Sequence, residues 1–171
     1  MAAIRHASFA PHVATDTRLL ILGSLPGARS LAERQYYAHP TNQFWRLLGD
    51  VLGRPLAAMP YTERLAELHA MKVGLWDVIR TAERRTSSDS DIREAEAHDL
   101  AALAAGLPDL RMIAFNGGKA AAIGRRQLPP LAGIALVDLP SSSAAHTIGF
   151  AAKRTQWMRL RAALAATGPS G

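Results

Sequence analysis

The sequence predicts an α/β fold: a single three-layer domain in which a central four-stranded parallel sheet is flanked by helices. Three observations predict it. The 171 residues suit one domain of ordinary size. Hydrophobic residues make up 49% of the chain, which is enough for a substantial core. Four short apolar runs alternate with segments of helical character, the pattern of a parallel sheet covered by helices. We therefore treat residues 1–171 as one domain with its core at about 17–167.

The four predicted strands are short apolar runs, each ending at a turn signal. They span 17–23 (TRLLILG), 73–79 (VGLWDVI), 111–118 (RMIAFNGG) and 133–140 (GIALVDLP). Apolar runs of this length are typical of strands buried on both faces of a sheet. Because ligands bind at the carboxyl ends of such strands, the loops at 24–42, 116–119 and 141–146 are expected to carry a site.

Helices are predicted between and after these strands. In residues 41–53, Thr41 can cap a helix with apolar side chains at helical spacing, and Gly53 can end it. Polar residues 80–91 show no period and are predicted to be a loop. Further helices are expected over 61–71, 91–107, 119–126 and 147–166.

Two of these helices carry additional signals. Asp91 with Glu94 three residues later forms a capping-box pattern at the start of the helix over 91–107. In the C-terminal helix, the spacing of Trp157, Leu160 and Leu164 predicts that these side chains face the core.

The charge balance is basic, with 20 Lys and Arg against 14 Asp and Glu, a formal charge of +6 and a pI of about 10.5. Such a balance suits a polyanionic partner, because each neutralised phosphate releases counterions. The alternative is that the charge serves solubility alone. Since cysteine is absent, disulfides, thiolate zinc sites and Cys-ligated iron–sulfur clusters are excluded. We see neither a secretory signal nor ~18 uninterrupted apolar residues, and expect a cytoplasmic protein outside the membrane.

The loop after the first strand combines a glycine-rich turn with crowded aromatic residues. The turn Gly23–Gly27 (GSLPG) can bring backbone N–H groups close to a phosphate or flat ligand, or its glycines can serve the turn alone. Adjacent Tyr36 and Tyr37 point opposite ways in extended chain, so one ring can be buried while the other stacks on a base. The alternative is that both rings belong to the core. Asn42 can hold a water, read a base edge or merely cap a helix.

The second and third loops offer further polar groups. Asn116 can pair with a carbonyl and an adjacent N–H of a base, or can hold a turn. Lys119 is a candidate phosphate contact or, if desolvated, a Schiff-base nucleophile. Three hydroxyls that can bond phosphate oxygens follow the fourth strand at Ser141, Ser142 and Ser143.

Three more ionisable residues are open candidates. His146 either takes part in the site or is a surface histidine. Asp89 and Asp77 are possible pocket carboxylates, although no motif places either of them as a general base.

The segment GSLPG…S…QYYAHPTNQFW resembles the first motif of the uracil-DNA glycosylase superfamily, closest to its hypoxanthine-DNA (deoxyinosine) glycosylase branch. GLWDVI, SSDSDI, AFNGGKA and LPSSSAAH resemble later segments of that branch in the same order, so the resemblance runs from Leu19 to about Trp157. The resemblance implies that a damaged nucleotide is flipped out of DNA into a pocket at the strand ends.

The same resemblance implies roles for particular residues. Tyr37 would stack on the flipped base, and Asn42, the Asn of HPTN, would take the catalytic role. Asn116 would read or line the base, and the loop after the fourth strand, with His146, would contact the DNA. The base-binding residues expected are Gly23, Ser24, Leu25, Pro26, Gly27, Tyr37, Phe44 and Asn116, and the DNA-binding ones are Lys119, Ser141, Ser142, Ser143 and His146.

The chain also departs from the family pattern. Ser24 and Leu25 stand where some branches carry a catalytic polar residue, and neither activates water well. Leu139 stands where well-known branches carry His or Asn before Pro-Ser, which removes the residue that would stabilise the leaving base. His146 either substitutes for it or only contacts the strand.

The predicted function is that of a monofunctional DNA glycosylase acting on uracil, hypoxanthine and possible further substrates such as xanthine. Each of these bases presents a carbonyl beside an N–H. We expect a monomer with no metal and no cofactor. One alternative is a non-catalytic module of the same fold that binds damaged DNA or abasic sites. Another is a small-molecule hydrolase or nucleotide-binding protein, although the chain lacks the dinucleotide and P-loop fingerprints.

Overall fold

The computed structural model describes residues 4–7, 9–84 and 92–165. Its centre is a sheet of four parallel strands in the order β3-β2-β6-β7. The strands are β2 (Leu19–Gly23), β3 (Val73–Asp77), β6 (Met112–Asn116) and β7 (Ala135–Leu139). Each lies inside one of the four apolar runs, so the predicted parallel sheet is confirmed.

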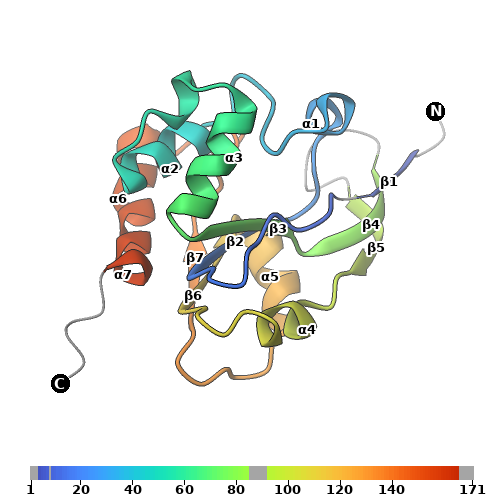
Figure 1. The fold of residues 1–171 in the computed structure, drawn as a ribbon. Coiled ribbons are helices and arrows are strands. Elements are labelled where there is room, and N and C mark those ends of the chain that lie inside the picture. The colour runs from blue at the N-terminus through green and yellow to red at the C-terminus, as the bar shows by residue number, and fades with distance from the viewer. Residues whose placement is uncertain (1–3, 8, 85–91, 166–171) are drawn as a thin grey trace.

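Helices cover both faces of this sheet (Figure 1). They are α1 (Ala28–Glu33), α2 (Phe44–Leu52), η1 (Leu56–Ala58), α3 (Tyr61–Ala70), α4 (Leu100–Ala105), α5 (Gly118–Gln127), α6 (Phe150–Trp157), η3 (Met158–Leu160) and α7 (Arg161–Leu164). Within the described ranges, no helix is both long and apolar enough to cross a membrane.

Strand β2 shows why the three layers form. Leu19 and Ile21 pack into the cluster that includes residues of α2, α3 and α6, whereas Leu20 and Leu22 pack into the cluster with α4 and α5. Alternate strand residues point to opposite faces, so a strand covered on both sides must be apolar throughout. All five residues of β2 are buried.

A second, three-stranded antiparallel sheet lies beside the first and was not predicted. Its order is β1-β4-β5, from β1 (Ile4–Ala7), β4 (Ile79–Arg84) and β5 (Ile92–Ala97). The loop predicted over 80–91 is therefore wrong for 80–84. The helix predicted over 91–107 is wrong for 92–97, where pairing with β4 overrides the helix propensity of Arg, Glu and Ala.

Helix α4 begins later than predicted, at Leu100. Its cap is Asp99, whose Oδ1 accepts a hydrogen bond from Ala102 N at 3.0 Å. Asp91, the predicted cap, and Asp89 lie outside the described residues.

Two other helix boundaries differ from the predictions. Helix α2 begins at Phe44, and Thr41 does not cap it, because the preceding Gln43 is the N-cap residue. Gly53 ends this helix with a φ of 66°, as predicted. The C-terminal helix begins at Phe150 after Gly149 and breaks into η3, yet Trp157 and Leu160 are fully buried as predicted, and Leu164 packs partly buried against them.

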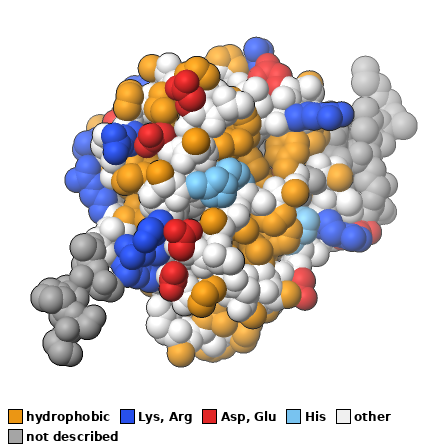
Figure 2. Space-filling model, viewed as in Figure 1, with side chains coloured by type: hydrophobic (Ala, Val, Ile, Leu, Met, Phe, Trp, Pro, Cys, Tyr) orange, Lys and Arg blue, Asp and Glu red, His pale blue; other side chains and the backbone are white. Residues whose placement is uncertain are grey.

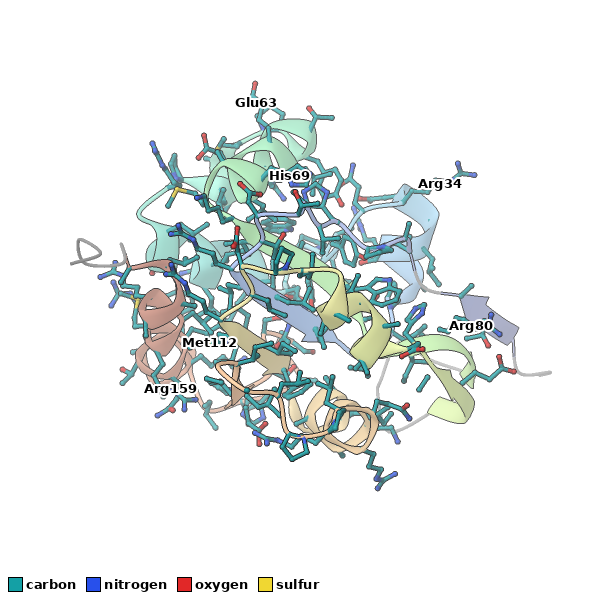
Figure 3. All side chains as sticks on the ribbon, turned by 60° about the horizontal axis from the view of Figure 1, so that its bottom comes forward. Arg34, Glu63, His69, Arg80, Met112 and Arg159 are labelled. Carbon is teal, nitrogen blue, oxygen red and sulfur yellow. The ribbon has the colours of Figure 1, made fainter. Side chains whose placement is uncertain are left out.

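Glu63 and Arg80 lie at the periphery, directed away from the central sheet (Figure 3). Arg159 lies at the edge of the sheet, where its Nη2 donates to Asp138 O of β7 at 2.7 Å. Met112, by contrast, lies at the start of β6 and is 7% exposed. On the face seen in Figure 2, basic side chains are spread around the outline and interspersed with acidic ones. The positive excess therefore forms no single block on this face.

Candidate active site

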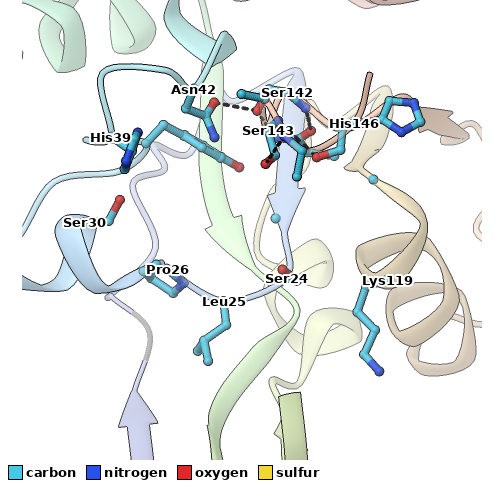
Figure 4. A pocket seen from close by; sticks show the side chains of 18 of the residues that line it. Ser24, Leu25, Pro26, Ser30, His39, Asn42, Lys119, Ser142, Ser143 and His146 are labelled. Carbon is cyan, nitrogen blue, oxygen red and sulfur yellow. Dashed lines mark hydrogen bonds between the residues drawn. The ribbon is translucent and has the colours of Figure 1, made fainter. Parts of the chain in front are cut away.

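A cavity of about 590 Å³ opens at the carboxyl ends of the parallel strands (Figure 4). It brings together the three loops selected from the sequence, which follow β2, β6 and β7. The predicted residues that line it are Gly23, Ser24, Leu25, Pro26, Gly27, Tyr37, Asn42, Asn116, Lys119, Ser141, Ser142, Ser143 and His146. The Tyr37 ring, the glycine turn and the Asn42 amide thus share one cavity.

The ring of Tyr37 forms one wall of this cavity, and Phe44 lies behind it. The two rings are nearly parallel, with centroids 3.8 Å apart and an interplanar angle of 12°. Phe44, predicted to bind the base, is fully buried at the start of α2 and does not line the cavity. Neighbouring Tyr36 packs into the core, where its hydroxyl donates to Ala10 O, and burial raises its pKa. Tyr36 also lines part of the cavity, and its ring lies beside that of Tyr37, with the two centroids 6.3 Å apart. The chain is not extended here, since Tyr37 has a φ of 53° in a turn, so the expected opposite orientation of the two rings is wrong.

The side-chain amide of Asn42 is held in one orientation. Its Oδ1 accepts hydrogen bonds from Phe44 N at 3.0 Å and from Ser142 Oγ at 2.8 Å. Because both donors engage the oxygen, the amide nitrogen is directed into the cavity, as Figure 4 shows. Asn42 therefore presents N–H donors to a ligand, and its carbonyl oxygen faces the protein.

Ser142 connects this amide to Asn116 at the end of β6. Asn116 Oδ1 accepts from Ser142 N at 2.9 Å, and Asn116 Nδ2 donates to Ser142 Oγ at 2.9 Å. Ser142 is 1% exposed, so its hydroxyl faces two amides inside the protein. The oxygen of Asn116 is likewise engaged, which leaves one N–H of its amide nitrogen for a base edge.

Glycine at two positions allows the loops that line the cavity to lie close to neighbouring side chains. Gly117 has a φ of 100°, and a Cβ there would lie 3.2 Å from Ser141 Cβ. A Cβ on Gly23 would lie 2.7 Å from both Asp77 Oδ1 and Tyr37 Oη. Asp77, which ends β3 and is 3% exposed, therefore belongs to the cavity wall.

Exposed polar groups surround the cavity mouth. Lys119 lies in the first turn of α5, and His146 is exposed in the loop after β7. In that loop, Ser141 Oγ accepts from Ser143 N at 3.1 Å, a local bond that shapes the turn. Leu139, in contrast, is 4% exposed in the core and does not line the cavity.

Sequence reasoning missed two charged or ionisable residues of the cavity, Arg29 and His39. Arg29 lies in the short helix α1, which was taken as part of a loop. His39 Nδ1 pairs with Thr41, accepting from its backbone N at 3.2 Å. The signal available for His39 was the segment HPT, in which this histidine stands two residues before Thr41, the residue that its ring contacts.

The chain is similar to known proteins over most of its length. Residues 10–165 match the model of the uracil DNA glycosylase superfamily. A hypoxanthine DNA glycosylase from Methanosarcina acetivorans is 40% identical over 144 residues, which covers 83% of this chain and 89% of the relative. Another, from Methanosarcina barkeri, is 40% identical over 116 residues, covering 68% and 73%.

A solved structure agrees in fold. The solution NMR structure of a Methanosarcina acetivorans protein assigned to the uracil DNA glycosylases matches with a TM-score of 0.81 at 35% identity. The match covers 94% of this chain and 99% of that one. The family model spans most of the domain, cavity loops included, and the chain therefore belongs to the uracil DNA glycosylase superfamily.

Proposed function

We propose that the protein is a monofunctional DNA glycosylase that flips a deaminated base out of DNA, hydrolyses its N-glycosidic bond and leaves an abasic site for base excision repair. Members of the superfamily are DNA N-glycosylases. Hypoxanthine is the first substrate we expect, because two relatives at 40% identity carry that name. Uracil and xanthine are further proposed substrates, since both share the carbonyl beside an N–H.

One observation carries this proposal: a stacking ring, a backbone turn and an oriented amide meet in one cavity at the strand ends. Tyr37 offers the ring face opposite to Phe44, on which a flipped base can stack. The remaining N–H of Asn116 can donate to a base carbonyl. Backbone N–H groups of the turn Gly23–Gly27 can receive the charge that develops on a base oxygen.

In the proposed reaction, the C1′–N bond breaks with its electron pair leaving on the base, while the sugar gains positive character. A water held by the Asn42 amide nitrogen forms the new C1′–O bond. The N–H donates to one lone pair of the water oxygen, which orients the other lone pair toward C1′. The water then loses one proton to solvent, and the departing base takes one up. No step is assigned to a metal or cofactor.

The mouth of the cavity supports DNA as the partner. Lys119 and His146 bring a positive charge and an ionisable ring to the same cavity as the hydroxyls of Ser141 and Ser143, which suits phosphate oxygens. We further propose a monomeric enzyme. The absence of cysteine is compatible with a reducing compartment such as the cytoplasm, which we propose as its location.

The test uses purified protein with end-labelled oligonucleotides that contain one hypoxanthine, uracil or xanthine, in single- and double-stranded form. Alkaline cleavage reveals abasic sites. We expect release of hypoxanthine, and we expect Asn42→Ala to lower the single-turnover rate roughly 100-fold or more, the usual cost of an oriented donor. Gln156→Ala, an exposed change on α6, is the matched control.

Other outcomes decide against parts of the proposal. Undiminished cleavage by Asn42→Ala would remove that residue from the site. Salt-sensitive DNA binding without base release would favour a non-catalytic damaged-DNA or abasic-site binding module. Binding of free nucleotides with indifference to DNA would favour a small-molecule site.

A further inference from the structure

Lys153, in the middle of α6, is a buried ionisable residue that the proposed mechanism does not use. It is only 1% exposed, although lysine is rarely buried this completely. Its Nζ donates to Gln43 Oε1 and to Ser143 O, both at 2.9 Å. Both acceptors are neutral, and burial lowers the pKa of this ammonium. A methionine would fill similar space without the cost of burying a charge.

The two acceptors are neighbours of the residues that orient the site. Gln43 follows Asn42, and Ser143 follows Ser142. Between these two segments, Gln43 N donates to Ser142 O at 2.9 Å. Next to that bond, Ser142 Oγ donates to Asn42 Oδ1 at 2.8 Å. The ammonium therefore links the start of α2 to the loop after β7, beside the two direct hydrogen bonds between these segments. We call this set of hydrogen bonds the bracket.

This bracket determines which end of the Asn42 amide faces the cavity. The hydroxyl of Ser142 reaches the amide oxygen only while the loop stays against the start of α2. If the loop moves outward, the amide keeps only the bond from Phe44 N and can rotate. Shifts of about 1 Å in positioning groups can cost as much as 100-fold in rate.

We infer that Lys153 is a positioning residue for base excision: its ammonium ties the loop after β7 to the start of α2 and thereby keeps the Asn42 amide nitrogen directed at the substrate. This inference rests on the proposed function. Lys153 does not line the cavity and acts through Ser142.

Lys153→Met tests the inference, because methionine keeps an unbranched side chain but removes all donors. We expect the single-turnover rate on hypoxanthine-containing duplex to fall roughly tenfold to 100-fold at a temperature where circular dichroism shows the variant folded. Lys153→Arg, which retains donors, should recover part of the rate. Gln156→Met, the same new residue on the exposed side of α6, should match wild type.

A double-variant comparison separates positioning from general stability. In a Ser142→Ala background the hydroxyl link is already absent, so adding Lys153→Met should cost little further rate. An equal fold-loss in both backgrounds, or a rate within twofold of wild type for Lys153→Met alone, would overturn the inference. If Lys153→Met does not fold, Gln43→Leu removes one acceptor of the same ammonium and undergoes the same comparison.

If the wild-type protein releases no base, the proposed function fails, and an activity assay can no longer test the role of Lys153. A measurement that does not depend on activity keeps that role testable. The side-chain amide of Asn42 gives its own pair of ¹H–¹⁵N signals. We expect Lys153→Met to shift these signals and to speed their hydrogen exchange. Signals identical to wild type would refute the positioning role whether or not the protein is a glycosylase.

Discussion

Replacing Ser142 by alanine should lower both stability and excision rate, because one buried hydroxyl links both asparagines of the cavity. The hydroxyl donates to Asn42 Oδ1 at 2.8 Å and accepts from Asn116 Nδ2 at 2.9 Å. The backbone bond from Ser142 N to Asn116 Oδ1 would remain. The change therefore removes two hydrogen bonds and leaves the loop otherwise attached.

The size of the stability loss depends on which hydrogen bonds Asn42 and Asn116 retain. Asn42 Oδ1 retains its bond from Phe44 N, so losing the hydroxyl costs about 1 kcal/mol there. Asn116 is 7% exposed and would hold an amide nitrogen without its acceptor, which costs about 2 kcal/mol. We expect the free energy of unfolding to fall by about 3 kcal/mol, which a domain of ordinary stability tolerates.

Urea denaturation followed by tryptophan fluorescence measures this change, since Trp45 and Trp157 are buried. A lower midpoint with an unchanged m-value would report lost stability. Ser143→Ala is the matched control: its hydroxyl accepts one exposed, local bond from Ala145 N at 3.2 Å, and its cost should stay below about 1 kcal/mol. We expect Ser142→Ala alone to slow single-turnover excision roughly tenfold to 100-fold, at least as much as Lys153→Met, as one restraint on the Asn42 amide is lost.

One result would refute this reasoning. If Ser142→Ala matched Ser143→Ala in stability and retained the wild-type rate, the hydroxyl would not orient the amides. The cavity would then owe its shape to the backbone alone.

Three further predictions concern other parts of the molecule. Gly23→Ala places a methyl 2.7 Å from Asp77 Oδ1 and Tyr37 Oη, so single-turnover excision should be largely lost; wild-type kinetics would show that the wall can move. Lys119→Ala should weaken DNA binding equally for all sequences and reduce the salt slope by about one unit; an unchanged slope in binding titrations would exclude a phosphate contact. Burial, and secondarily a nearby arginine, lowers the pKa of His98 from 6.5 to about 4. The unfolded chain then binds more protons between these values, and stability should fall as pH drops from 6.5 toward 4. His98→Gln should make this dependence shallower in urea titrations, and the remainder includes the share of His12, whose pKa burial also lowers.

Three strands of the central sheet, β2, β3 and β6, were predictable because they are buried on both faces, whereas β7 at the edge is partly exposed. Leu19 to Leu22 form an unbroken apolar run for this reason, and a turn follows each such strand. The antiparallel sheet was not predictable, since Ile92–Ala97 has the sequence IREAEA, whose composition favours helix. Its strand conformation depends on pairing with Ile79–Arg84, between residues 8 to 18 positions apart, and composition alone does not record this pairing.

The loops of the cavity were predictable, but the network within them was not. Asn116 and Ser142 follow strands, whereas the role expected of Asn42 came from the resemblance of HPTN to the family motif. Their mutual hydrogen bonds span 26 and 100 residues, and one-dimensional spacing does not reveal such pairs. The sequence also held an indication for Lys153. This residue lies four positions before Trp157, on the side of the C-terminal helix that is predicted to face the core. A basic residue on that side is expected to be buried.

The parallel rings of Tyr37 and Phe44 have a consequence for the energetics of extruding a nucleotide. A base that leaves a duplex gives up contact with its flanking bases. Here the buried Phe44 ring supports the Tyr37 ring from behind, with centroids 3.8 Å apart. If a flipped base stacks on Tyr37 as proposed, the protein supplies a rigid substitute for one neighbour in the DNA stack, and the base becomes the third ring of a column that exists before DNA arrives.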